Sequence, residues 1–299
     1  MPQAIAVIAL ASAAPTCHHD PLRMPGGECS GGPRELTVSD AMRLHVEAEG
    51  DGPVVVLAHG FAGSARNWGP QARALKSRYR IVRYDARGHA RSEAPDDPAA
   101  YSLDALVADM GQVMDEVGAS RAVVGGTSMG AVTALAFATA QPARVRGVLA
   151  ASLPASPRTG SGLARIAPAF ADAIDREGLE AAGARFIWGP ESGLDARGAK
   201  LVRQGFMEHS PRALAHGLRG VVARWPAIDE LSGLERLTAP LLIVTGTNDA
   251  GALDASRELA ARVGHAEQVV IPDAGHLVNL EQAARFNEAL ATWLDRLPA

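Results

Sequence analysis

The chain has 299 residues, of which 47% are hydrophobic and 21% charged, and this composition is typical of a folded globular protein. Its 29 Lys and Arg against 33 Asp and Glu give a net charge of −4 without a basic run, which disfavours a dedicated nucleic-acid-binding surface. No apolar stretch approaches the roughly 18 residues that cross a bilayer, so we expect no integral membrane protein.

Residues 1–33 lack the regular pattern of the rest of the chain. Ala4 to Ala11 form a short apolar run that leads into the small residues 11–13, as at a signal-peptidase site, but no Lys or Arg precedes this run. We therefore predict an extension without regular structure on a cytoplasmic protein. The alternative is a secreted or periplasmic protein whose leader is residues 1–13.

Both cysteines of the chain, Cys17 and Cys29, lie in this extension, which excludes a disulfide framework for the body of the protein. Together with His18 and His19 they are residue types that bind zinc, but their Pro- and Gly-rich surroundings offer no strand or helix to orient ligands. The body of the chain has no cluster with ligand spacing. We therefore expect neither a metal nor a cofactor.

From Arg34 onward, apolar strand-like segments alternate with helical ones. Alternating residues around Leu36 and Leu44 flank Ser39-Asp40 and predict a hairpin of two strands. Wholly apolar runs, typical of strands covered on both faces, follow at residues 54–58, 81–82, 122–124, 145–149, 241–244 and 269–271. Helical patterns lie at residues 103–117, 129–140, 256–263 and 280–297. The alternation predicts an α/β fold, with a mostly parallel, eight-stranded type of sheet and helices on both faces.

One segment, residues 155–235, contains no convincing buried strand but has helical stretches such as 163–176 and 212–225. An all-helical insertion between two strands of a sheet predicts a cap over the strand ends. The expected organisation is an extension at residues 1–33, an α/β core at residues 34–154 and 236–299, and a helical cap at residues 155–235.

A serine lies where a buried strand meets a helix, in the segment Gly126-Thr127-Ser128-Met129-Gly130. On a sharp strand-to-helix turn, a serine hydroxyl projects clear of the sheet. Glycines two residues to either side are needed because the strand and helix backbones approach closely there. We therefore predict that Ser128 is a nucleophile.

A serine nucleophile needs a base, and the base needs a third group that orients it. Of the nine histidines, His276 lies directly after the last predicted strand, at the sheet edge where α/β proteins collect functional residues. Asp249 lies just past the strand at 241–244, whereas the loop after residues 145–149 offers no carboxylate. The chain order Ser128, Asp249, His276 is that of a catalytic triad on this kind of sheet.

A tetrahedral intermediate also needs hydrogen-bond donors for its oxyanion. One is the backbone N–H of Met129, the residue after the nucleophile. The second is expected from the loop after the strand at 54–58, where Gly60 and Gly63 allow the backbone to turn inward. The N–H of Phe61 is the natural donor in that loop.

Taken together, these motifs resemble the α/β-hydrolase family, in the branch with a helical cap inserted after the sixth strand. The resemblance covers about residues 34–299 and rests on His59-Gly60-Phe61, the segment 126–130, Gly246-Thr247-Asn248-Asp249, Gly275-His276, and the segment Asp85 to Ser92, which is a structural turn in that family. The chain departs from the family pattern at Ala131, where a second glycine is common, and at Gln282-Ala283, where a proline is common.

The resemblance implies a serine hydrolase that cleaves a small-molecule ester or lactone through an acyl-enzyme on Ser128, similar to enol-lactonases and small-ester hydrolases. It implies no cofactor, metal, nucleic-acid or membrane partner. Three alternatives stay open: hydrolysis of carbon–carbon bonds in ring-fission products, cofactor-free haloperoxidase or perhydrolase activity, and a non-catalytic binding protein. A serine in place of an aspartate nucleophile disfavours haloalkane dehalogenase and epoxide hydrolase activities.

Overall fold

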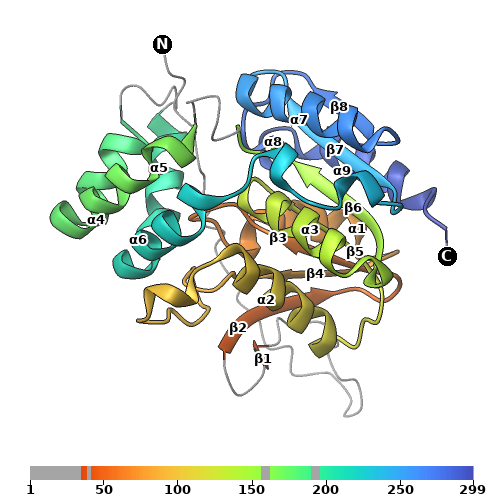
Figure 1. Cartoon of the computed structure of the whole chain (residues 1–299), viewed down its shortest axis with the longest axis horizontal. Helices are drawn as coiled ribbons and strands as arrows, with labels where there is room; N and C mark the ends of the chain where they lie inside the picture. Colours follow the sequence, from red (N-terminus) through yellow and green to blue (C-terminus); the bar gives the residue numbers. More distant parts are fainter. Residues whose placement is uncertain (1–34, 39–41, 156–161, 190–195, 299) are drawn as a thin grey trace, which may run out of the picture.

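A sheet forms the centre of the computed structural model, which describes residues 35–38, 42–155, 162–189 and 196–298 (Figure 1). Its strands are β1 (Glu35–Val38), β2 (Met42–Glu49), β3 (Val54–Ala58), β4 (Arg80–Tyr84), β5 (Ala122–Thr127), β6 (Val145–Ala151), β7 (Leu241–Gly246) and β8 (Glu267–Ile271). Their spatial order is β1-β2-β4-β3-β5-β6-β7-β8. β2 pairs antiparallel with β1 and with β4, and the other neighbours are parallel.

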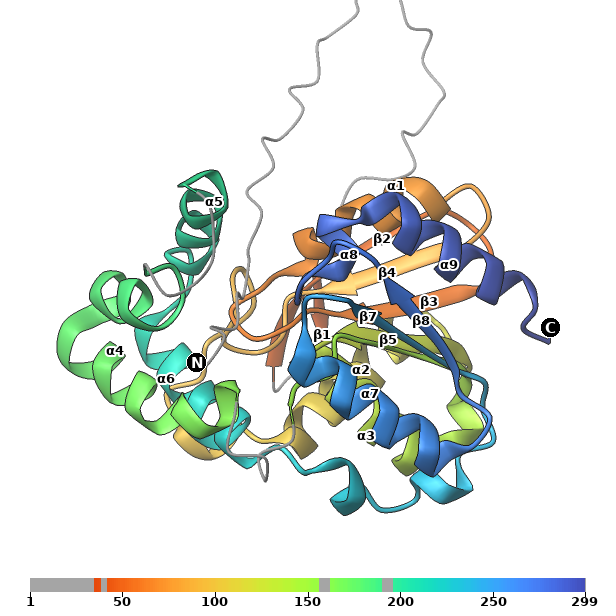
Figure 2. The ribbon, with the colours of Figure 1, turned by 90° about the horizontal axis from the view of Figure 1, so that it is seen from above.

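Helices cover both faces of the sheet (Figure 2). They are α1 (Gly69–Leu75), α2 (Leu103–Glu116), α3 (Met129–Ala140), α4 (Leu163–Phe186), α5 (Ala196–Phe206), α6 (Pro211–Gly220), α7 (Ala250–Val263), α8 (Val278–Glu281) and α9 (Ala283–Asp295). Side chains of β3 alternate between two apolar clusters, since successive strand residues point to opposite faces. Val56 and Ala58 pack with residues of α2, α3 and α7, whereas Val55 and Leu57 pack with residues of α1, α8 and α9.

The predicted α/β class, the mostly parallel sheet and the helices on both faces are confirmed. The turn predicted at Ser39-Asp40 and the extension at residues 1–33, with its leader and metal-site alternatives, lie outside the described residues. None of the described helices is long and apolar enough to span a membrane.

At three places a local feature explains a difference from the predicted helices, including α1, where no helix was predicted. α7 begins at Ala250 because Asp249 caps it, accepting a hydrogen bond from the Ala252 amide at 3.1 Å. α1 begins with Gly69-Pro70, which favours a turn in the sequence but is tolerated in a first helical turn. The helix predicted at 280–297 is two helices, separated at Gln282, whose φ of −126° and ψ of 50° are not helical.

Every regular element within the described part of residues 155–235 is helical, and we call this segment the cap. Its helices α4, α5 and α6 lie together beside one end of the sheet in both views (Figures 1 and 2). Aromatic rings form its centre: Phe170 of α4 stacks on Phe206 of α5 at 5.8 Å and on Phe186 at 4.9 Å between ring centroids. These ring contacts hold α4 and α5 together and are part of the same apolar cluster as the core residues Val56 and Phe61.

The backbones of β5 and α3 approach each other closely at their junction near the edge of the sheet. A Cβ on Gly126 would lie 2.3 Å from the carbonyl carbon of Gly130, and one on Gly130 would lie 2.3 Å from the Ala58 carbonyl oxygen. Both obstacles are backbone atoms, which cannot move aside as a flexible side chain can. The glycine spacing in the sequence is therefore a steric requirement of this turn.

We expect Gly130→Ala to lower the free energy of unfolding by about 1–3 kcal/mol, the usual cost of overpacking, as measured by urea denaturation. Gly111→Ala in α2 is the matched control. A Cβ there would meet only ordinary contacts, the nearest being Phe137 at 3.4 Å, so its stability should be unchanged or slightly raised. Equal effects of the two substitutions would contradict the steric argument.

Candidate active site

Ser128 occupies the sharp turn between β5 and α3 with strained backbone angles, φ 53° and ψ −115°. A positive φ is unfavourable for a residue with a Cβ and persists only where its surroundings hold it. Here the Ser128 amide donates to the Ala151 carbonyl at 3.0 Å, and the Ser128 carbonyl accepts from the amides of Ala131 and Val132. The neighbouring strand and the first turn of α3 thus hold the serine at the edge of the sheet.

His276 and Asp249 form a hydrogen-bonded pair at the same edge. The Nδ1 of His276 lies 2.6 Å from Oδ2 of Asp249, and Oδ1 of Asp249 accepts the Ala252 amide at the start of α7. A carboxylate at Nδ1 orients the ring so that Nε2 presents its lone pair. This Nε2 is buried and has no hydrogen-bond partner among the described residues.

The carboxyl of Asp249 stays ionised in this setting. Burial by itself would raise its pKa, but the hydrogen bond and charge of His276, together with the Ala252 amide, hold the pKa below its usual value. An ionised Asp249 is what stabilises an imidazolium on His276. The pair is therefore electrostatically suited to receive a proton at Nε2.

The structure brings Ser128, His276 and Phe61 to one small cavity. Its lining residues are Gly60, Phe61, Gly63, Asn67, Thr127, Ser128, His276, Leu277 and Asn279. Asp249 lies behind His276, away from the cavity lining, as expected of a residue that acts on the ring rather than on a ligand. Met129 follows Ser128 in the chain and is buried.

The loop after β3 presents the second predicted donor. Residues Gly60 to Gly63 form a turn in which the Gly63 amide donates to the Gly60 carbonyl at 3.0 Å, with Ala62 at a φ of 54°. A Cβ on Gly60 would lie 3.3 Å from the Cβ of Ser128, so the turn lies directly against the serine. Neither the Phe61 nor the Met129 amide has a protein acceptor within the described part of the chain.

His59 fixes the orientation of this turn. Its Nε2 accepts the Ala86 amide at 2.9 Å, so the proton is on Nδ1, which donates to the Gly60 carbonyl at 2.7 Å. Complete burial lowers the pKa of His59 to about 4, so the ring is neutral. Because a trans peptide holds its C=O and N–H in opposite directions, anchoring the Gly60 carbonyl turns the Phe61 N–H the other way.

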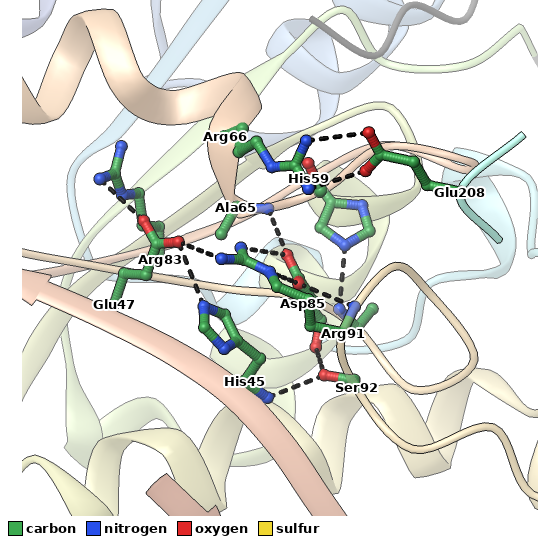
Figure 3. A network of polar contacts seen from close by, with 12 residues as sticks. His45, Glu47, His59, Ala65, Arg66, Arg83, Asp85, Arg91, Ser92 and Glu208 are labelled. Carbon is green, nitrogen blue, oxygen red and sulfur yellow. Dashed lines mark hydrogen bonds and ion pairs between the residues drawn. The ribbon is translucent and has the colours of Figure 1, made fainter. Parts of the chain in front are cut away.

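A buried polar network lies behind the turn (Figure 3). Asp85, which is fully buried, accepts the Ala65 amide at 2.7 Å and pairs with Arg91 at 2.9 Å. Arg91 also pairs with Glu47 of β2, and Glu47 pairs with Arg83 of β4, each at 2.8 Å. The segment Asp85 to Ser92 therefore supports the loop after β3 and contributes no group to the cavity lining.

Glu281 is a positioning group that sequence reasoning missed. Its carboxylate accepts the Gly275 amide at 2.7 Å and the Leu277 amide at 3.0 Å, the two amides that flank His276. Two charge-assisted hydrogen bonds to the backbone on either side hold the histidine loop in place. The only signal in the sequence was an acidic residue five positions after the histidine. The short helix α8 brings this residue back to the histidine loop.

The sequence profile of the alpha/beta hydrolase fold matches residues 53–283 of this chain. The chain belongs to the α/β-hydrolase family. A putative carbamate hydrolase RutD of Variovorax paradoxus (strain S110) is 30% identical over 275 residues, which cover 86% of this chain and 98% of that protein. A putative 2-succinyl-6-hydroxy-2,4-cyclohexadiene-1-carboxylate synthase of Bacillus subtilis (strain 168) is 29% identical over 269 residues, 87% of this chain and 97% of the relative.

Among solved structures, the enol-lactonase from Burkholderia xenovorans LB400 superposes with a TM-score of 0.74 at 26% identity, covering 86% of this chain and 98% of that one. An alignment that covers 86% of this chain extends beyond the sheet and its covering helices into residues 155–235. Family membership and these relatives support a hydrolase activity for this α/β-hydrolase.

The network behind the turn predicts a specific acid dependence of stability. Burial raises the pKa of Glu47, but the His45 hydrogen bond and the charges of Arg83 and Arg91 outweigh it and lower the pKa from 4.5 to about 2. A lowered folded-state pKa stabilises the protein above the unfolded value, and this stabilisation is lost as the pH falls toward 2. The shift corresponds to about 3 kcal/mol.

The test is urea denaturation of the wild type and of Glu47→Gln at pH 4.5 and at about pH 2. We expect the free energy of unfolding to fall over this range in both proteins, and to fall by about 3 kcal/mol more in the wild type. The glutamine cannot titrate, so it removes this contribution to the slope while leaving the other carboxylates. An identical acid dependence in the two proteins would show that Glu47 is not held ionised by the network.

Proposed function

We propose that this α/β-hydrolase is a serine hydrolase that cleaves a small-molecule carboxylic ester or lactone through an acyl-enzyme on Ser128. The observation that carries the proposal concerns His276, which lines the same cavity as Ser128. Its Nδ1 is hydrogen-bonded to Asp249, and its Nε2 has no hydrogen-bond partner in the described part of the chain. A strained serine, a ring nitrogen with a free lone pair and a buried carboxylate are the parts that nucleophilic acyl transfer needs.

In the acylation step, Ser128 Oγ attacks the carbonyl carbon while His276 Nε2 takes the hydroxyl proton. Asp249 stabilises the resulting imidazolium. Negative charge develops on the former carbonyl oxygen, and the backbone N–H groups of Phe61 and Met129 donate to it. Collapse of the tetrahedral intermediate breaks the carbon–oxygen bond, and His276 returns its proton to the leaving alkoxide, which departs as an alcohol.

Deacylation repeats this chemistry with water as the nucleophile. His276 Nε2 takes a proton from water, the hydroxide attacks the acyl carbon, and the same two amides donate hydrogen bonds to the oxyanion of the second intermediate. The proton then returns to Ser128 Oγ, releasing a carboxylic acid. For a lactone, the alcohol and the acid are parts of one product.

Two of the relatives, the carbamate hydrolase and the enol-lactonase, act on substrates that are compatible with this chemistry. An enol-lactone and a carbamate are both carbonyl derivatives, whose hydrolysis passes through tetrahedral species that two amide donors can stabilise. The similarity to the enol-lactonase, at 26% identity over nearly all of both chains, favours an ester or lactone carbonyl. It supports the proposal without identifying the substrate.

We also propose that the chain is divided into a core at residues 34–154 and 236–299 and the cap at residues 155–235, with substrate bound between them. The cap approaches the cavity at two points. A Cβ on Gly217 of α6 would lie 3.5 Å from the ring of Phe61, and the ring of His209 lies 3.1 Å from the Gly63 carbonyl oxygen. The ring of Phe61 therefore extends from the Gly60–Gly63 turn toward the cap.

Ser128→Ala tests the nucleophile. It should lower kcat for p-nitrophenyl acetate by about a million-fold and abolish labelling by a fluorophosphonate probe, with an unchanged circular dichroism spectrum. Ser152→Ala is a matched control, because Ser152 is also buried, follows β6 and has a positive φ of 44°. It should retain both turnover and labelling. A Ser128→Ala protein with a tenth of the wild-type rate would exclude the proposed mechanism.

Asp249→Asn separates the chemical from the structural role of this residue. An asparagine still caps α7 through the Ala252 amide, so stability should be nearly unchanged, while kcat falls about 10⁴-fold because the wrong His276 tautomer is favoured. Asp249→Ala should lose a similar amount of activity. It should also lower the free energy of unfolding by about 1 kcal/mol, because α7 loses its N-cap side chain. Near-normal kcat in Asp249→Asn would assign the acid to another residue.

A further inference from the structure

A histidine of the cap reaches into the turn that carries the Phe61 amide. His209 lies between α5 and α6 and is buried, with 5% of its surface exposed. Its Nε2 lies 3.1 Å from the carbonyl oxygen of Gly63, the last residue of the Gly60–Gly63 turn. Its Nδ1 lies 3.0 Å from the Gly205 carbonyl within the cap. Each ring nitrogen therefore faces a backbone carbonyl, one in the turn and one in the cap, and a neutral ring donates to one of the two at a time.

The turn needs such support because its backbone is strained. Ala62 has a φ of 54°, which is unfavourable for a residue with a Cβ. Residues of the core hold the turn at both ends. His59 binds the Gly60 carbonyl, and the amide of Ser64, the residue after the turn, donates to Oδ1 of Asn67 at 2.7 Å. The Gly63 carbonyl is held from the cap side, by His209.

Neighbouring contacts reinforce this connection. Glu208, the residue before His209, forms an ion pair with Arg66, which lies shortly after the turn (Figure 3). Oε2 of Glu208 is 2.7 Å from Nη2 of Arg66. The His209 ring packs edge-on against His89 with 5.4 Å between centroids, and His89 in turn packs edge-on against Phe61 at 5.7 Å. Two successive cap residues thus contact the loop that places the Phe61 amide next to Ser128.

We propose that His209 is a positioning residue for the oxyanion hole, which acts by donating from Nε2 to the Gly63 carbonyl and so holding the Phe61 amide toward the reacting carbonyl. Phe61 itself belongs to the core, so the cap completes the geometry of a donor that it does not contain. The inference rests on the proposed serine-hydrolase function, because only an oxyanion requires this amide to be aligned. Substrate affinity is not expected to depend on it.

Replacing His209 by Gln or by Asn tests the contacts of its two ring nitrogens separately. The side-chain nitrogen of His209→Gln reaches about as far as Nε2 and can donate to Gly63, whereas that of His209→Asn reaches about as far as Nδ1 and can serve only the cap. Both keep a polar group in the buried site. The measurement is kcat and KM for p-nitrophenyl acetate, with thermal denaturation of each variant and with Ser128→Ala as the blank.

We expect His209→Gln to keep kcat within about threefold of wild type, and His209→Asn to lose at least about tenfold, a part of the 10²–10³-fold effect of deleting a donor outright. KM should stay within about twofold in both. His265→Gln is the control, since His265 is exposed and its Nε2 also contacts a backbone carbonyl, that of Ala239 at 3.2 Å, far from the cavity. It should leave kcat unchanged.

Equal kcat values in the two variants, or a loss confined to KM, would overturn the positioning role while leaving the serine-hydrolase proposal intact. A wild type without Ser128-dependent turnover would overturn both. If His209→Asn does not fold, Arg66→Met replaces it, because it breaks the half-exposed pair with Glu208 without opening the core. Its kcat should then fall about two- to fivefold at constant KM, and an unchanged kcat would overturn the proposal.

Discussion

The close approach of α3 to the ends of β3 and β5 is the constraint on which the rest of the site depends. With no Cβ on Gly126 or Gly130, the helix begins against the Ala58 carbonyl, and the chain turns at Ser128 with a positive φ. The same contact brings the loop after β3 against the serine. One steric condition therefore sets both the position of Ser128 at the edge of the sheet and its distance from the turn that carries Phe61.

The Gly60–Gly63 turn is held by polar groups that do not line the cavity. His59 anchors the Gly60 carbonyl, Asp85 anchors the Ala65 amide, and charges from β2 and β4 hold Asp85 and Arg91 in place. Burying so many polar groups is favourable only when each has partners, because an unpaired one carries the full cost of desolvation. The core thus supports one arrangement of the turn in preference to others.

The cap contacts this scaffold through both apolar and polar groups. Its aromatic centre belongs to the same continuous apolar cluster as Phe61 and Met129. Glu208 and His209 add polar contacts to the loop after β3. In the proposed mechanism, the position of the cap and the alignment of the Phe61 amide are consequently coupled.

The sequence by itself determined the fold class, because the periodicity of apolar residues and the apolar runs are local properties that can be read from one sequence. The spacing of Gly126, Ser128 and Gly130, and the positions of Asp249 and His276 after their strands, were enough to predict that these residues meet at one edge of the sheet. Only the tertiary structure decided what orients them. Glu281 on the histidine loop, His59 on the Gly60 carbonyl and His209 from the cap act across turns or long sequence separations. No local pattern encodes such contacts, since they arise from the packing of elements whose relative positions the sequence does not state.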